Sequence, residues 1–357
     1  MKKELVTLTP LLTELFDIAF LSIKKPSKSR CGDHLSIEFL DNESTLIAMV
    51  CDGVGSRSAD YLASEMVCSN WSNYFKKTQG TIPERIKKAT LAVNEDLLTV
   101  EDAKKGLMTT QTLVVYDISN QHIYIQNVGD SRTYIQRKSE LIQATEDDAK
   151  SIVVKDRSGK PLKTKDGFVL TAMGINNAIG QVGVKLNVKT ILPDDAKLVR
   201  GFVLVSDGFY SCPDFEQDAL NILCTTNMQE ALNVVMKKNL DHQQDDMTAV
   251  FIRQKTENLL NDKNIFTFLK ESSQEEIFNE YNSVEIAKYI LAELEANLKD
   301  PKNDNTAMDL LHVIDKLSID FGRKKYIQLY DLFKENNVRN DDVARALIQK
   351  IRSSKNP

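Results

Sequence analysis

Short acidic turns beside apolar runs are the residues of this 357-residue chain most able to do chemistry. In each of them a carboxylate stands where a predicted buried strand begins or ends. Several carboxylates at one rim of a sheet repel one another, and hard divalent cations are what usually makes such a cluster tolerable. The pattern therefore predicts a metal site lined by carboxylates. The acids concerned are Asp52, Asp130, Asp207, Asp245 and Asp246.

The elements that would hold these turns are short apolar strands and amphipathic helices. Apolar runs predict strands over residues 16–23, 35–39, 46–50, 111–116, 123–128, 198–205 and 248–252, with another beginning at 134. Apolar residues at helical spacing predict helices over residues 59–75, 82–104 and 228–240. Each acid would then stand at the junction between a strand and a turn.

The sequence pattern changes near Lys255. From there to the C-terminus only helical periodicity is present, in about four segments separated by polar breaks. We therefore expect one domain over residues 1–255 and a small all-helical appendage over residues 256–357, joined by the polar stretch 255–263. Within the first domain, the lysine-rich stretch at about 146–180 is expected to be a solvent-exposed, flap-like excursion.

Composition excludes several classes of protein. A net charge of −5 argues against a general nucleic-acid binder, which would usually be basic. No apolar run approaches the ~18 residues that span a bilayer, and acidic residues interrupt the N-terminal region where a secretory signal would lie. The five cysteines are scattered without a Cys-x-x-Cys pair, which is typical of free thiols in a reducing compartment. We expect a cytoplasmic protein that binds neither nucleic acid nor membrane.

Six short motifs, taken in order, resemble the metal-dependent Ser/Thr protein phosphatases of PPM type (type 2C), in a bacterial-like form with an extra C-terminal helical region. The resemblance covers residues 16–253 and implies an α+β fold: a four-layer α-β-β-α sandwich with two antiparallel sheets. The predicted strand pairs separated by helices agree with that architecture. The motifs are Cys-Gly-Asp-His at 31–34, Cys-Asp-Gly-Val-Gly-Ser at 51–56, Met-Thr-Thr at 108–110, Val-Gly-Asp-Ser-Arg at 128–132, Val-Ser-Asp-Gly-Phe at 205–209 and Asp-Asp-Met-Thr at 245–248.

The resemblance implies a site for two Mg²⁺ or Mn²⁺ ions. Asp52 would bridge the two ions, and the carbonyl of Gly53 would bind the second. Asp207 and Asp245 would complete the protein ligands of the first ion. Oxygen ligands of this kind suit both cations, which retain several waters and need few protein ligands.

Two further acids have supporting roles in the family pattern. Asp33 would bind a metal directly or through water. Asp130, together with Asp207, could hold a third and weaker ion. The implied reaction is hydrolysis of phosphoserine or phosphothreonine in proteins, by direct attack of a hydroxide that bridges the metals and without a phosphoenzyme intermediate.

The chain departs from the family pattern at three positions. Gly32 precedes Asp33 where the family usually has a second acid. Lys28 stands where the family has its phosphate-binding arginine, and Arg30 lies closer to Asp33; either could bind phosphate, although lysine lacks the bidentate fork. Asp246 stands where the family usually has asparagine and is interpreted as a solvated neighbour of the site.

These departures leave a second hypothesis open. The chain could be a catalytically silent phosphatase-like module that binds or regulates a partner. The appendage at 256–357 is interpreted mainly as a small core, although an exposed apolar stripe there could bind a protein partner or a second copy of the chain.

Overall fold

The structure is a computed structural model in which two compact units, Met1–Lys255 and Thr256–Pro357, are distinguished and are described separately below. It describes residues 5–6, 15–40, 44–54, 60–100, 106–137, 140–156, 158–164, 167–196, 198–225, 227–255, 265–274, 277, 283–299, 304–336 and 340–354. The polar stretch expected to link the two domains lies, beyond Lys255, outside the described residues.

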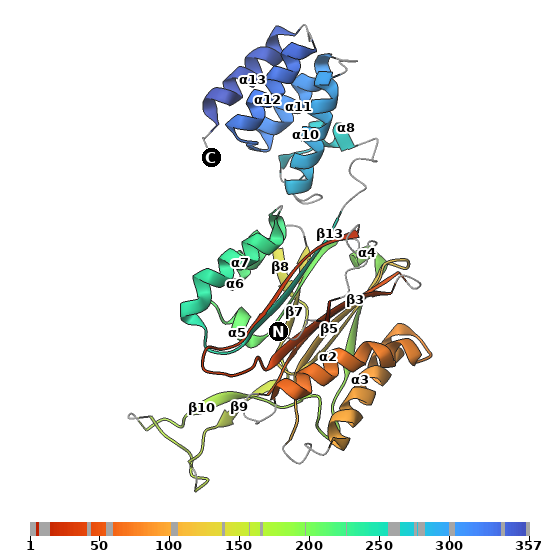
Figure 1. Ribbon diagram of the computed structural model, residues 1–357, viewed down its shortest axis with the longest axis vertical. Coiled ribbons are helices and arrows are strands. Elements are labelled where there is room, and N and C mark those ends of the chain that lie inside the picture. The colour runs from red at the N-terminus through yellow and green to blue at the C-terminus, as the bar shows by residue number, and fades with distance from the viewer. Residues whose placement is uncertain are drawn as a thin grey trace. The chain divides into compact units, whose positions relative to one another are not determined.

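Two sheets form the centre of the first unit (Figure 1). All neighbouring strands in them are antiparallel, apart from a two-residue parallel pairing of β1 with β3. The first sheet has the order β1 (Leu5–Val6), β3 (Asp33–Leu40), β4 (Thr45–Asp52), β5 (Gln111–Asp117), β6 (His122–Val128) and β11 (Asn187–Ile191). The second has the order β2 (Phe16–Ile23), β13 (Met247–Gln254), β12 (Val199–Val205), β7 (Arg132–Arg137) and β8 (Glu140–Gln143).

Helices cover the outer face of each sheet. On the first sheet lie α2 (Asp60–Lys77) and α3 (Ile82–Thr99), and on the second lie α6 (Phe215–Cys224) and α7 (Met228–Asn239). The inner faces pack on each other through residues such as Leu46 and Phe202. The predicted α+β class and the four-layer α-β-β-α sandwich are therefore confirmed.

The sequence of β4 shows why this strand lies at the centre of the layers. Its side chains alternate between the two faces of the sheet. Leu46 and Val50 enter the core between the sheets, whereas Ile47 and Met49 pack under α2 and α3. Both faces are covered, so the strand is a continuous apolar run rather than an alternating one, and it carries Asp52 to the edge of a rigid scaffold.

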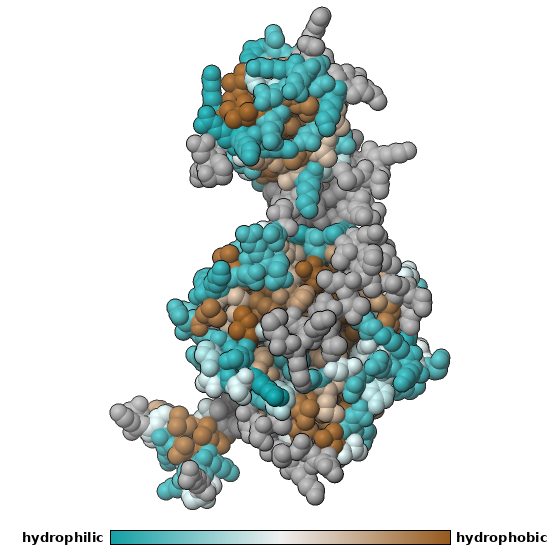
Figure 2. Space-filling model, in the orientation of Figure 1, coloured by the Kyte–Doolittle hydropathy of each residue, from teal (hydrophilic) through white to brown (hydrophobic). Residues whose placement is uncertain are grey.

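A small hairpin projects from the first unit within the lysine-rich stretch (Figure 1). Its strands are β9 (Ala149–Val153) and β10 (Thr171–Ile175), which pair antiparallel. Apolar residues are exposed on this projection (Figure 2), and Phe168 is 73% exposed. The hairpin therefore contributes little to the core of the sandwich.

The second unit is helical throughout its described residues. Its helices enclose a separate core in which Leu294, Leu311 and Leu347 are buried. Of the helices described in either unit, none is long and apolar enough to cross a membrane. The helices of the second unit are α8 (Ile265–Glu271), α10 (Ser283–Lys299), α11 (Asp304–Lys316), α12 (Arg323–Glu335) and α13 (Asp341–Ser353).

Because each unit has a core of its own, the first should fold without the second. We expect a fragment comprising residues 1–255 to give a single cooperative unfolding transition, within a few degrees of its transition in the full chain. Differential scanning calorimetry of the fragment, the complementary fragment and the full chain would measure this. A 1–255 fragment without a cooperative transition would contradict it.

Candidate functional site

The topology of the first unit brings the acidic turns to one rim. Asp52 ends β4 and Asp33 begins β3, and the two residues are directly paired in the antiparallel register. Asp207 follows β12, and Asp245 precedes β13, which is the antiparallel neighbour of β12. In antiparallel neighbours the end of one strand lies beside the start of the next, so each sheet delivers two acids to the same edge.

Electrostatic coupling shows how close these acids lie. Burial raises the pKa of Asp52 well above its usual range, and the charges of Asp33, Asp207 and Asp130 raise it further. Burial also raises the pKa of Asp207, with a further contribution from the charge of Asp245. The pKa of Asp130 rises to about 6 because of burial and the charge of Asp207. Asp33, Asp52, Asp130, Asp207 and Asp245 are therefore connected by a chain of electrostatic interactions, with Asp52 and Asp207 at its centre.

Asp33 is the most enclosed of these carboxyl groups. Burial raises its pKa to about 7, and the charge of Asp246 adds to the rise, while the nearby hydroxyls of Ser206 and Thr248 oppose it. Even so, neither carboxylate oxygen of Asp33 accepts a hydrogen bond of ordinary geometry. Asp33 as a whole is only 2% exposed. Asp207 Oδ1 is likewise buried without a partner.

Buried carboxylate oxygens without partners are costly, and a hard divalent cation is the ligand that would satisfy them. The donor set is made of oxygens, as Mg²⁺ and Mn²⁺ prefer. The residues therefore fit such ions. In the part of the chain that the structure describes, however, no three His, Cys, Asp or Glu residues are already grouped in a way that could hold a metal ion.

Glycines allow the acidic turns to approach other backbone closely. A Cβ atom at Gly53 would collide with the backbone carbonyl of Asp60, and one at Gly208 would collide with the carbonyl of Asp246. Asp52 is held from the neighbouring strand, since Thr110 N–H donates to its carbonyl oxygen (2.8 Å). The close approach of backbone at Gly53 and Gly208 explains why glycine follows the acid in both turns. Gly55 and Ser56, from the motif that contains Asp52, lie outside the described residues.

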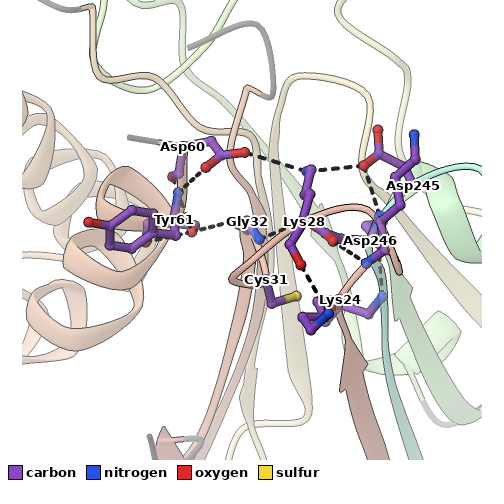
Figure 3. Close-up of polar contacts among 12 residues, drawn as sticks. Lys24, Lys28, Cys31, Gly32, Asp60, Tyr61, Asp245 and Asp246 are labelled. Atoms are coloured by element: carbon purple, nitrogen blue, oxygen red, sulfur yellow. Dashed lines mark hydrogen bonds and ion pairs between the residues drawn. The ribbon is translucent and has the colours of Figure 1, made fainter. Parts of the chain in front are cut away.

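A second polar group gathers around the Lys28 ammonium (Figure 3). Lys28 Nζ is 2.7 Å from Asp246 Oδ2, 3.1 Å from Asp245 Oδ1 and 3.4 Å from Asp60 Oδ2. Partial burial lowers the pKa of Lys28, but the bonds to Asp246 and Asp245 outweigh this, and its pKa is raised. Arg30, the other candidate for phosphate binding, lies with its guanidinium 4.8 Å from the centre of the Tyr61 ring.

Two features of this group differ from the sequence analysis. The interpretation of Asp246 as a solvated neighbour is wrong: it is 1% exposed and accepts hydrogen bonds from the backbone of Lys25 and Gly32 as well as from Lys28. Asp60, the first residue of α2, was not identified at all. An acid in the first turn of a helix is ordinary because of the helix dipole, so the sequence offered no signal for it.

An open cavity of about 490 Å³ lies close to Asp130. Tyr210, on its wall, donates a hydrogen bond from its hydroxyl to the carbonyl oxygen of Asp130 (3.1 Å). Arg132, also on the wall, stacks on Tyr210 and forms an ion pair with Asp147. None of the acids expected at the metal site lines this cavity; the hydrogen bond from Tyr210 is what connects its wall to Asp130.

Comparison with known proteins identifies the family. Residues 25–243 match the family model described as "Protein phosphatase 2C". The chain is 26% identical over 230 residues to the "Serine/threonine phosphatase stp" of Listeria monocytogenes serotype 4b (strain F2365), covering 60% of this chain and 86% of the relative. It is 25% identical over 218 residues to the "Probable protein phosphatase 2C 28" of Arabidopsis thaliana, covering 56% of this chain and 60% of the relative.

The fold is also shared with a solved structure. The serine/threonine phosphatase Stp1 from Staphylococcus aureus superposes with a TM-score of 0.52 at 17% identity, covering 71% of this chain and 98% of that one. The family match spans more than half of the chain and includes Asp33, Asp52, Asp130 and Asp207, whereas Asp245 lies two residues beyond its end. This chain belongs to the protein phosphatase 2C family.

Proposed function

We propose that this protein hydrolyses phosphoserine and phosphothreonine in proteins and depends on Mg²⁺ or Mn²⁺ for that reaction. The observation that carries the proposal is the set of mutually coupled acids at one rim, with buried oxygens of Asp33 and Asp207 left without partners. The family membership and the printed names of the relatives support it. The substrate class would be phosphorylated proteins.

Two ions would be held mainly by Asp52, Asp207, Asp245 and the carbonyl of Gly53, with Asp33 nearby and Asp130 beside a third, weaker ion. When bound, the ions supply Lewis-acid chemistry that activates water at neutral pH and offsets the charge of the phosphoryl group. The role of the carboxylates would be to hold the ions in place, with Asp33 and Asp52 fixed at the ends of paired strands and Asp207 at the start of α5 (Asp207–Tyr210).

Phosphate binding is assigned in this proposal to Arg30. The Lys28 ammonium has three N–H donors, and three carboxylates already lie within ion-pair distance of it. Arg30 is exposed, lies with its guanidinium over Tyr61, the residue after Asp60, and carries the planar fork suited to a phosphoryl group.

The wider organisation follows from the same proposal. The unit over residues 1–255 would be the catalytic domain, with the hairpin at 149–175 as its flap, and the helices of the second unit would bind a partner or a second copy. The five cysteines, all free thiols, are compatible with the cytoplasm, where we place the protein.

One observation favours a second candidate function, that of a catalytically silent binding module. Lys28 forms an ion pair with Asp245, so one of the expected metal ligands already has a cationic partner within the chain. A silent module would bind Mn²⁺ weakly or not at all and would show no turnover.

Substitution of the central acids tests the enzyme. We expect Asp52→Asn and Asp207→Asn each to lower kcat/KM for a phosphothreonine peptide in Mn²⁺ by on the order of 10³-fold or more, because each removes a charge that would hold the cations. A matched control is Asp241→Asn, which changes an exposed acid four residues before Asp245. It should leave the rate within about twofold. Near-normal rates in both site variants would rule the mechanism out.

Metal should also stabilise the folded protein. Binding only to the native state adds about 2.7 kcal/mol at a hundredfold excess over Kd, and here it relieves carboxylate repulsion. We expect the Tm in excess Mn²⁺ to exceed the Tm in chelator by about 5–10 °C. The difference should shrink in Asp52→Asn. Equal melting temperatures in Mn²⁺ and chelator would count against cation binding.

The raised pKa of Asp33 predicts a pH effect in the absence of metal. The carboxyl is protonated in both states below its unfolded pKa of 3.8. As pH rises toward the folded value of about 7, the unfolded state ionises first, so stability falls. Asp33→Asn should remove this loss and raise the free energy of unfolding by on the order of 2–4 kcal/mol at about pH 8 in chelator.

Urea unfolding of the wild type and Asp33→Asn at about pH 5 and about pH 8 measures this effect. Asp241→Asn serves as the exposed control and should show the pH dependence of the wild type. A gain in Asp33→Asn that is equal at both pH values would contradict the assignment to a buried carboxyl.

A further inference from the structure

The space beside Gly32 is occupied by an acid from another element. A Cβ atom at Gly32 would lie 2.9 Å from Asp60 Oδ2 and 3.0 Å from Asp246 Oδ2. Position 32 therefore has no room for a side chain while these two carboxylates keep their places. The Asp60 carboxylate, delivered from the start of α2, stands where an acid on position 32 would begin.

The Lys28 ammonium is surrounded by carboxylates. Its Nζ lies within 3.4 Å of Asp60, Asp245 and Asp246, and these contacts come from the first turn of α2 and from the residues leading into β13 (Figure 3). Three carboxylates around one ammonium leave a local charge of −2. Among the described residues these three carboxylates are not a ready-made metal site, and the cation that they contact is an ammonium of the chain itself.

The surroundings distinguish this group from a surface ion pair. Exposed pairs contribute little, but Asp246 is 1% exposed, and the side chains of Asp60 and Lys28 are 16% and 25% exposed. Asp245 is the most open member of the group, with its side chain 46% exposed. The chain neighbour of Gly32, Asp33, has both carboxylate oxygens buried without a hydrogen-bond partner, so the residues next to this group also lack positive charge.

We propose that the Lys28 ammonium is a built-in cation of the acidic centre, occupying a cation position formed by Asp60, Asp245 and Asp246. Asp60 supplies from α2 the carboxylate for which Gly32 leaves room. The chain would then bind one divalent ion fewer than its acids could hold, and Lys28 would compete with metal for Asp245. This inference rests on the metal-binding part of the proposed function.

Isothermal titration of the chelator-stripped full chain with Mn²⁺ tests the proposal. Lys28→Met removes the ammonium and keeps the length of the side chain. We expect it to bind one more Mn²⁺ per chain than the wild type, or to bind Mn²⁺ at least about tenfold more tightly, because three carboxylates lose their cation. Lys28→Gln should give the same result, which guards against a folding defect peculiar to one variant.

Two controls isolate the position of the charge. Lys24→Met removes an equal charge four residues away, from a side chain that donates to the carbonyl of Lys28, and should leave Mn²⁺ binding within about twofold of the wild type. Adding Asp60→Asn to Lys28→Met should abolish the gain, because the proposal makes Asp60 one of the released ligands. Circular dichroism confirms that each variant is folded.

Folded Lys28→Met and Lys28→Gln that bind the same number of ions, with affinity changed by less than about tenfold, would overturn the proposal. So would a gain of the same size in Lys24→Met. The result is independent of turnover: a wild type that hydrolyses phosphopeptide while Lys28→Met gains no ion defeats this inference and leaves the proposed function intact. Gain of an ion by Lys28→Met in a chain without turnover supports the inference and defeats the enzyme.

Discussion

Repulsion between carboxylates fixed at one rim is the constraint on which the site depends. Asp33 and Asp52 cannot move apart, because the register of β3 and β4 pairs them directly. Asp207 is held just beyond the end of β12, and the two sheets that carry these acids are locked together by a shared apolar core. The fold therefore holds negative charges together that solvent would separate, and any cation that binds there acts on stability as well as chemistry.

Positive charge can reach this rim from bound divalent ions or from Lys28 of the chain itself. Divalent ions would satisfy the buried oxygens of Asp33 and Asp207, whereas Lys28 already satisfies Asp246 and the neighbouring Asp245. The electrostatic effect of a carboxylate on its neighbours depends on its position in space. Whether a strand or a helix carries the carboxylate does not change that effect. That is why Asp60 at the start of a helix can take the place beside Gly32.

Much of the fold could be predicted from periodicity, because burial on one or both faces leaves a direct trace in residue order. The strand Phe16–Ile23 has the predicted bounds, and the continuous apolar run before Asp52 is a doubly covered strand. Helix α6 and the exposed strand β8 were not predicted, because short elements show too few repeats of the hydrophobic pattern. The helix expected over 82–104 ends at Thr99, and residues 101–105 lie outside the described part.

The sequence by itself determined that several carboxylates stand at the ends of apolar runs and that their motifs occur in the order of a known family, and it determined the change to helical periodicity near Lys255. Only the tertiary structure decided the partners of those acids. Asp60, Lys28 and Asp246 meet although as many as 218 positions separate them along the chain. The electrostatic interactions and close backbone contacts between these residues depend on how the sheets and helices pack. The order of residues along the chain does not reveal them.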